Sequence, residues 1–481
     1  MGNTIPRVLD SVSTLETDFL LPQEFLNGFV STGEESAVLS IHINDLPEEI
    51  LLKIFSYFSA PELCRRIIPV CTAWRRIGYD PSLWTSLKFG SGWAATRGVK
   101  ADTIKHLIQL SPRLKIFEYY SNASISLIIK QLAKYCHSLQ ILELQCKPLT
   151  FKTVEALVTN CPNIRQLSLY KIEGTDHTKY LPLANLKHLQ ALELSGCEWA
   201  DDDFMLAMSA NCTKLEYLNL QSLCHFDESL SVFLSNCIQT LRTLKLCIYD
   251  ISDVTFQKIS QCTFLERLTI DLAVNITDAA FIQFQNLKHL QSITLSRLWH
   301  ISPGTCEAVF GHPSMKNLQD VELDNARAVD DIVIKSLVQN ASNLRVLSLE
   351  GCACVSDDAL YAVVAWSKNL VYLNLERMTG LHGHFLVGID AMLPLLRVLR
   401  VDSCSAIDRT FLENISSTKK RGSKLSVFTE YSHSYKDMET SFMRYPATHQ
   451  ARFQVDFNIM NVKRVFPSEL SSYVTRKSIW S

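Results

Sequence analysis

The sequence predicts an α/β solenoid of repeated strand–helix units, preceded by a small helical module near the N-terminus. Three observations predict this architecture. An apolar pattern recurs every 24–28 residues, helical patterns lie between its copies, and a separate group of short amphipathic helices precedes residue 90. Because a solenoid grows in one dimension, the 481 residues need not form several globular domains.

The recurring pattern is Leu-x-x-Leu-x-Leu, in which Ile, Val, Phe or Tyr can replace Leu. It begins at Leu114, Leu139, Ile164, Leu189, Leu215, Leu241, Leu265, Leu290, Leu318, Leu344, Leu370 and Leu396. A weaker thirteenth copy begins at Leu425. The centre of each copy alternates apolar and polar residues, which predicts a short strand. A fixed period of this length is the signature of a solenoid.

A helix is predicted after each strand. In residues 356–369, for example, Leu360, Val363 and Val364 fall on one helical face. Ser or Thr followed by Asp recurs at the expected helix starts, where side-chain oxygens can cap free amides. These pairs begin at Ser252, Thr277 and Ser356. Strand plus helix in each period predicts a horseshoe with a parallel inner sheet and outer helices, built from about 12–13 repeats over residues 90–428.

Seven of the fifteen cysteines fit the same period. Four lie three residues before a repeat start, and three lie three residues after the last apolar strand residue: Cys136, Cys161, Cys212, Cys262, Cys197, Cys352 and Cys404. A small apolar side chain at a fixed repeat position indicates core packing. Cys352 and Cys354 are too close together, and lack a second pair, for a zinc site. The pattern, over roughly residues 84–428, resembles the cysteine-containing subtype of leucine-rich repeats, which is typical of F-box proteins.

Residues 43–89 are predicted to form three short helices. Asn44 and Asp45 are cap candidates ahead of Pro47, which suits a first helical turn. A broad apolar stripe follows, formed by Ile50, Leu51, Ile54, Phe55 and Phe58. So small a module cannot absorb the whole stripe in its own core. Two interpretations remain open: a docking face for another protein's helices, or packing onto the solenoid.

The same residues resemble the F-box. The resemblance lies in Leu46-Pro47, Glu49-Ile50-Leu51, Ile54-Phe55, Pro61-Glu62-Leu63, Val70-Cys71, Trp74 and Leu83-Trp84. Thr72 is a mild departure, because the family usually has a basic residue there. The resemblance implies that a Skp-type adaptor, which bridges to a cullin, contacts Leu46, Pro47, Ile50, Ile54, Phe55 and Leu63. Val70, Trp74 and Trp84 are expected to pack internally. Residues 84–89 already match the strand spacing, so a zeroth strand is predicted to join module and solenoid.

The predicted concave face is acidic, because alternate strand residues line it. Its acids are Glu118, Glu143, Glu193, Asp271, Asp320, Glu322, Asp324, Glu350, Glu376 and Asp402, against Lys245, Arg267 and Arg400. Like charges on neighbouring strands repel, so a cation should compensate them. One interpretation is a substrate site formed by Asp320, Glu322, Asp324, Glu350, Glu376, Asp402 and Tyr372, which would bind a basic segment. The other is that water and salt screen an open surface.

The C-terminal segment is basic, with eleven Lys or Arg against five acids from Lys419 onward. We therefore expect a tail, residues 429–481, that folds back along the acidic strands. The rival expectation is a disordered tail that leaves the acids for a basic partner. Lys419-Lys420-Arg421 is a candidate nuclear address. The remaining divisions are a flexible segment 1–40, an F-box at 41–89 and the repeats at 90–428.

Composition excludes several classes of function. The net charge of −2 indicates neither nucleic acid nor membrane binding, and there is no run of eighteen apolar residues. The N-terminus lacks a signal-peptide pattern, and Pro6 breaks the myristoylation motif. No phosphate loop, nucleophile elbow or zinc signature occurs, so no cofactor is expected. The prediction is a non-catalytic substrate-recognition subunit of a Skp-cullin-F-box ubiquitin ligase, cytoplasmic or nuclear. The alternative is a leucine-rich-repeat scaffold or inhibitor without a ligase role.

Overall fold

A computed structural model describes residues 43–90, 100–221, 227–247, 251–407 and 425–428. The predicted N-terminal segment 1–40, the basic cluster Lys419-Lys420-Arg421 and the tail 429–481 lie outside these described residues. The chain divides into two units, Met1–Ile301 and Ser302–Ser481.

The first unit begins with a helical module. Its elements are η3 (Ile43–Asp45), α2 (Glu48–Phe55), α3 (Ala60–Glu62), the π-helix η4 (Leu63–Ile67), α4 (Thr72–Gly78) and η5 (Pro81–Leu83). The predicted second helix is thus a short α-helix continued by a π-turn. The predicted caps were wrong, because Pro47 precedes α2 without a side-chain bond. Asn44 instead accepts a bond at 2.8 Å from the indole of Trp74.

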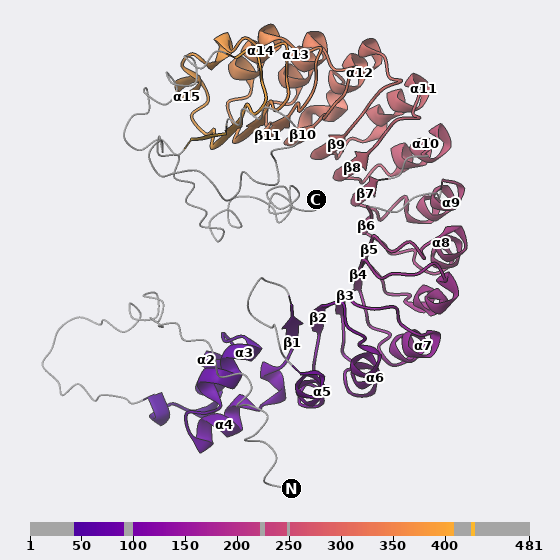
Figure 1. The fold of residues 1–481 in the computed structure, drawn as a ribbon, viewed down its shortest axis with the longest axis vertical. Helices are drawn as coiled ribbons and strands as arrows, with labels where there is room; N and C mark the ends of the chain where they lie inside the picture. The colour runs from indigo at the N-terminus through magenta and orange to yellow at the C-terminus, as the bar shows by residue number, and fades with distance from the viewer. Residues whose placement is uncertain (1–42, 91–99, 222–226, 248–250, 408–424, 429–481) are drawn as a thin grey trace, which may run out of the picture. The chain divides into compact units, whose positions relative to one another are not determined.

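The repeats of the first unit alternate strands with helices (Figure 1). The strands are β1 (Ser86–Phe89), β2 (Ile116–Tyr120), β3 (Ile141–Gln145), β4 (Gln166–Tyr170), β5 (Ala191–Ser195), β6 (Tyr217–Leu220), β7 (Thr243–Cys247), β8 (Arg267–Asp271) and β9 (Ser292–Leu295). The helices are α5 (Ala101–Gln109), α6 (Ser126–Tyr135), α7 (Phe151–Asn160), η6 (His177–Lys179), η7 (Leu181–Asn185), α8 (Asp202–Ser209), α9 (Glu228–Cys237), α10 (Asp253–Gln261), α11 (Asp278–Phe281) and η8 (Ile282–Asn286). Each strand pairs in parallel with the next, beginning with the predicted zeroth strand β1.

The second unit continues the same pattern. Its helices are α12 (Pro303–Phe310), η9 (Pro313–Asn317), α13 (Asp331–Asn340), α14 (Asp357–Trp366), η10 (His384–Leu386) and α15 (Ile389–Met392). Its strands are β10 (Asp320–Glu322), β11 (Val346–Ser348), β12 (Tyr372–Asn374), β13 (Val398–Arg400) and β14 (Ser426–Phe428), again parallel neighbours. The weak thirteenth copy of the pattern is therefore a strand.

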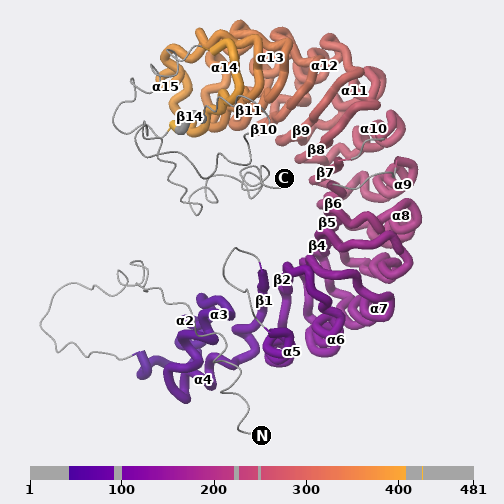
Figure 2. The backbone as a smooth tube through the Cα atoms, viewed as in Figure 1, coloured from indigo at the N-terminus to yellow at the C-terminus, as the bar shows by residue number. Residues whose placement is uncertain are grey.

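Within each unit the helices cover one face of the parallel sheet (Figure 1). Successive strand–helix repeats lie side by side along the tube of Figure 2. The pattern leucines fill the layer between sheet and helices, where Leu139, Leu142 and Leu144 of one repeat are fully buried. Alternate strand residues lie on the opposite face, called the open face below. The predicted parallel-sheet solenoid is thus confirmed.

The repeat cysteines are buried, as expected from their period. Several of their thiols also bond the backbone of the preceding repeat. Cys161 Sγ lies 3.4 Å from the carbonyl oxygen of Cys136, and Cys136 Sγ lies 3.5 Å from the carbonyl oxygen of Ser111. Burial raises the pKa of Cys161 to about 12, so its thiol stays protonated at neutral pH. These cysteines pack the core and are not reactive groups.

The Ser/Thr-Asp pairs have two roles. Ser252 and Ser356 cap their own helices, accepting bonds from the amides of Val254 and Asp358. In the pairs that begin at Ser252 and Ser356, the Asp also reaches the next repeat. Asp253 accepts bonds from the amide and hydroxyl of Thr277 at 2.9 and 2.6 Å, and Asp357 accepts bonds from the amides of His382 and His384. The predicted cap at Thr277 was wrong, because it makes no side-chain cap bond. The recurring Asp therefore ties adjacent repeats together.

Candidate functional site: an adaptor face and an acidic strand face

Helix α2 separates an exposed apolar face from a buried one. The glutamates of its first turn, Glu48 and Glu49, favour the positive end of the helix dipole. Leu51 and Phe55, four residues apart, are buried. Ile50 lies one position earlier and is 48% exposed. The broad stripe seen in the sequence is therefore two stripes: one forms the core of the module and one faces outward.

The buried stripe packs on aromatic side chains. The ring centroids of Phe55 and Trp74 lie 5.0 Å apart. Trp84 is fully buried, and its indole N–H donates to the carbonyl oxygen of Gly78 at 3.0 Å. Arg76 of α4 forms an exposed ion pair with Glu48 of α2 at 2.7 Å. These contacts give the module a core of its own and hold the exposed stripe in place.

The structure divides the six predicted adaptor residues into two groups. Pro47 and Ile50 are exposed, and Leu46 and Ile54 are half-buried. Phe55 and Leu63 are fully buried, which corrects the expectation that they form a contact surface. They belong to the core of the module instead.

Two further side chains behave differently from the sequence prediction. Val70 was expected to pack internally but is 56% exposed. Tyr57 was overlooked and is 67% exposed. It lies in the turn that follows α2, where the helical pattern of the sequence does not reach. Leu46, Pro47, Ile50, Ile54 and Tyr57 together are called the adaptor face below.

The module is continuous with the repeats. Strand β1 follows η5 directly, and Leu87 and Lys88 pair with Phe117 and Glu118 of β2. The backbone carbonyl of Thr85 also accepts bonds from Lys115 and Ile116. Because the last strand of the module is the first strand of the sheet, backbone hydrogen bonds join the two.

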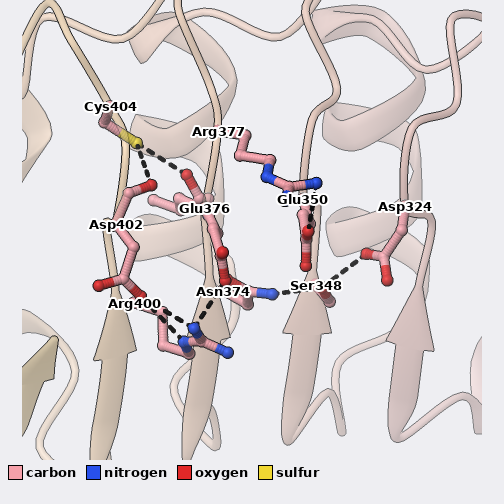
Figure 3. Close-up of polar contacts among 10 residues, drawn as sticks. Asp324, Ser348, Glu350, Asn374, Glu376, Arg377, Arg400, Asp402 and Cys404 are labelled. Carbon is pink, nitrogen blue, oxygen red and sulfur yellow. Dashed lines mark hydrogen bonds and ion pairs between the residues drawn. The ribbon is translucent and has the colours of Figure 1, made fainter. Parts of the chain in front are cut away.

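The open face of the second unit carries the predicted acids, but arginines lie among them (Figure 3). Arg400 of β13 contacts Glu376 at 2.6 Å and Asp402 at 3.0 Å. Arg377 reaches Glu350 at 3.4 Å. Glu376 and Asp402 are buried. These five residues are called the carboxylate–arginine network. Its two arginines are cations of the chain itself that compensate part of the repulsion expected among the acids.

A chain of hydrogen bonds from neutral donors continues this network across β11 (Figure 3). The hydroxyl of Ser348 donates to Asp324 at 2.7 Å, and the side-chain amide of Asn374 donates to Ser348 at 3.0 Å. The amide oxygen of Asn374 accepts a bond from the backbone of Glu376. This region is therefore fixed by its own polar contacts.

The remaining predicted substrate residues line the same strands. Asp320 and Glu322 are half-buried on β10. Tyr372 on β12 is buried, and burial raises the pKa of its hydroxyl to about 12. Arg377 was missing from the sequence-based surface because it follows β12 and breaks the strand alternation. Its φ of 61° turns the side chain toward Glu350.

Other candidate chemistry receives no support within the part of the chain that the structure describes. His382 and His384 are exposed, and Asp357 holds their backbone amides at 3.0 and 2.9 Å. No group of three or more metal-ligating side chains comes together among the described residues. In the same residues, no helix combines the length and apolar character needed to cross a membrane.

Comparison with known proteins agrees with this arrangement. Residues 43–89 match the profile of the F-box-like family. Residues 177–302 match the leucine-rich repeats of an FBD-associated F-box protein. Both resemblances found in the sequence are thereby confirmed: an F-box segment is followed by leucine-rich repeats.

Individual relatives cover less of the chain. F-box/LRR-repeat protein 5 of Danio rerio is 25% identical over 213 residues, which are 37% of this chain and 31% of that protein. F-box only protein 6 of Mus musculus is 42% identical over 53 residues, 11% of this chain and 18% of that protein. The chain thus spans less than a third of the length of either relative.

A solved structure supports the fold. The crystal structure of the Rad7 and Elc1 complex in yeast aligns with a TM-score of 0.52 and 17% identity. The alignment covers 67% of this chain and 83% of that one. At this identity the match describes the fold alone.

Proposed function

We propose that this protein is the substrate-recognition subunit of a Skp-cullin-F-box type ubiquitin ligase. The F-box segment binds the Skp-type adaptor through the adaptor face, and the adaptor bridges to the cullin. The open face of the repeats binds the protein substrate, with the seven predicted residues of the second unit as part of that surface. The chain itself performs no catalysis.

One observation carries the proposal: the exposed apolar face of α2 lies in a segment that matches the F-box. Ile50 and Ile54 lie on the same helix as Phe55, whose buried ring packs against Trp74 and anchors α2 in the module. A preorganised apolar patch loses little conformational entropy on binding. The continuous strand pairing between β1 and β2 supports the second half of the proposal, because it fixes the repeats to the adaptor-binding segment.

The test is adaptor capture by a variant that carries Ile50→Asp and Ile54→Asp. Each change would bury a carboxylate without a partner in the complex, which costs several kcal/mol. We expect affinity for a purified Skp-type adaptor to fall at least about a hundredfold. Phe55 is left unchanged, because truncating a fully buried aromatic side chain costs about 3–5 kcal/mol of folding stability.

Leu127→Asp is the matched control. Leu127 is an exposed apolar residue in the first turn of α6, so the control adds the same kind of charge outside the adaptor face. It should capture the adaptor as the wild type does. Undiminished capture by the double variant would refute the F-box role and favour the alternative, a leucine-rich-repeat scaffold or inhibitor.

The non-catalytic role has its own test. The purified chain, mixed with ubiquitin and its activating and conjugating enzymes only, should modify no protein. Transfer should require the added adaptor, cullin and ring components. Ubiquitin transfer by the chain alone would contradict the proposal.

A further inference from the structure

Two tyrosines of the first unit meet on the open face. Tyr120 lies on β2 and Tyr170 lies on β4, two strands away. Neighbouring strands are about 4.8 Å apart, so the side chains must lean across the sheet to meet. Their ring centroids are 5.8 Å apart, at 32° to each other, and both rings are half-buried.

A carboxylate anchors each tyrosine hydroxyl. Tyr120 donates to Glu143 on β3, and Tyr170 donates to Glu193 on β5 at 3.0 Å. Neutral amides hold the same carboxylates: Gln166 donates to Glu143 at 3.0 Å, and Asn219 donates to Glu193 at 2.9 Å. The rings are therefore fixed in place and present a preformed aromatic surface.

These carboxylates have no cation in direct contact. Within the described residues, neither Glu143 nor Glu193 forms an ion pair with a lysine or arginine, whereas Glu118 on β2 is paired with Lys88. Lys245 lies over the ring of Tyr217 and acts on Glu193 only through space, where it favours the ionised carboxylate. An ionised carboxylate offers about four acceptor sites, and Glu143 uses two of them. A cation could therefore bind without displacing the existing contacts.

We propose that Tyr120, Glu143, Tyr170 and Glu193 form a recognition site for arginine side chains in an extended segment of the substrate. A guanidinium group is planar, so it can stack on a tyrosine ring and donate to a carboxylate at the same time. The inference rests on the proposed function, because it names the substrate feature that the repeats would bind.

The strand spacing predicts the spacing of the arginines. Glu143 and Glu193 lie on strands β3 and β5, so their separation is about two strand spacings, roughly 9.6 Å. A polyproline II segment rises about 3.1 Å per residue with three residues per turn. Residues three apart therefore lie on one side, about 9.3 Å from each other. The site fits two arginines separated by two residues.

The probe is a fluorescently labelled, proline-rich synthetic peptide with two arginines three positions apart. We expect saturable binding to the full chain, measured by fluorescence anisotropy. Two reference peptides carry either citrulline at both positions, which removes the charge, or arginines only two positions apart. Each should bind at least about tenfold more weakly, because a charge-assisted contact is lost.

The protein variant combines Glu143→Gln with Glu193→Gln, which keeps the shape of both side chains. It should weaken binding of the arginine peptide at least about tenfold and leave binding of the citrulline peptide unchanged. Glu216→Gln is the control for charge, because Glu216 is exposed and lies outside the proposed site. A network that serves only to stabilise the sheet would change thermal stability without this selective loss.

Three results would overturn the inference: no saturable binding up to about 1 mM peptide, equal binding of the citrulline peptide, or equal binding by the double variant. Adaptor capture is measured on the same proteins and should be unaffected by Glu143→Gln with Glu193→Gln. A failure of adaptor capture by the wild type would refute the proposed function alone. A failure of peptide binding with intact adaptor capture would refute the recognition site alone.

Discussion

The two units use acids on the open face in different ways. In the first unit, Glu143 and Glu193 are held by tyrosine, asparagine and glutamine, which are neutral donors. In the second unit, Glu376 and Asp402 are buried beside Arg400. Neutral donors fix a carboxylate but leave its charge available, whereas an arginine neutralises it. Acids on the open face can thus be held by neutral donors, or they can form internal ion pairs.

This difference changes where a basic substrate is expected to bind. Counting acids along the sequence favours the last four strands, which carry six of them. The structure shows that Arg400 and Arg377 already neutralise some of these acids through ion pairs. The strength of an acidic surface therefore depends on the partners of its carboxylates more than on their number.

The largest expected effect comes from removing the central cation of the carboxylate–arginine network. Arg400→Met would leave Glu376 and Asp402 buried without the ion pairs that Arg400 supplies. Breaking a buried ion pair by removing one partner costs about 3–5 kcal/mol. We expect a loss of about 3 kcal/mol in the free energy of unfolding, measured by chemical denaturation.

Arg377→Met sharpens the comparison. Its ion pair with Glu350 is longer, and half of the arginine side chain is exposed. The loss should stay below about 1 kcal/mol, as for most surface ion pairs. Equal losses in the free energy of unfolding for Arg400→Met and Arg377→Met would show that burial does not increase the contribution of the Arg400 ion pairs.

The next effect compares the same repeat position in the two units. Asp357 is buried and accepts bonds from three backbone amides, those of His382, Gly383 and His384. Asp253 is half-buried and accepts bonds from the amide and hydroxyl of Thr277. Asp357→Ala should cost about 2 kcal/mol and Asp253→Ala about 1 kcal/mol, because buried amides left without acceptors are the more costly.

Hydrogen exchange tests this interpretation directly. In Asp357→Ala the amides of residues 382–384 should exchange faster, while the helix α14 should keep its protection. In Asp253→Ala the increase should be confined to Thr277 and its neighbours. Unchanged exchange at residues 382–384 would mean that the loop is held by its apolar contacts alone.

Most of the fold could be predicted because the period itself carries the information. A repeat of about 25 residues with Leu-x-Leu at its centre fixes strand, helix and buried cysteine together, and even the weak copy at Leu425 precedes a strand. The adaptor face was harder to predict. Its stripe was wide, and only packing against Trp74 decides that Phe55 lies inside while Ile50 lies outside.

Charge pairing was the least predictable feature. Strand alternation assigns a face to each residue within a strand. Arg377 follows the strand in a left-handed conformation, so alternation does not predict the direction of its side chain. Tyr120 and Tyr170 lie on strands that are not neighbours, and their spacing in sequence does not reveal that their rings meet. Such contacts depend on side-chain direction, which a periodic pattern does not specify.

The smallest effect concerns the pH dependence of the first unit. Burial raises the pKa of Glu193, although bonds from Tyr170 and Ser195 oppose the change. A carboxyl group with a raised pKa in the folded state contributes stability below its unfolded pKa. It loses that contribution as pH rises through the folded pKa. We therefore expect the stability of the wild type, relative to Glu193→Gln, to fall as pH rises from 4 to 7.

Glu62 provides a control of opposite sign. Partial burial raises its pKa, but hydrogen bonds from the side chain and backbone of Ser59 outweigh burial, and the pKa is lowered overall. A lowered pKa gives stability that is present above the unfolded pKa and lost as pH falls. The wild type should therefore gain stability relative to Glu62→Gln over the same rise in pH. Urea unfolding of the three proteins measures both slopes. If the stabilities of the wild type and of Glu193→Gln changed in parallel with pH, the neutral donors around Glu193 would compensate fully for its burial. Its pKa would then equal that of an exposed glutamate.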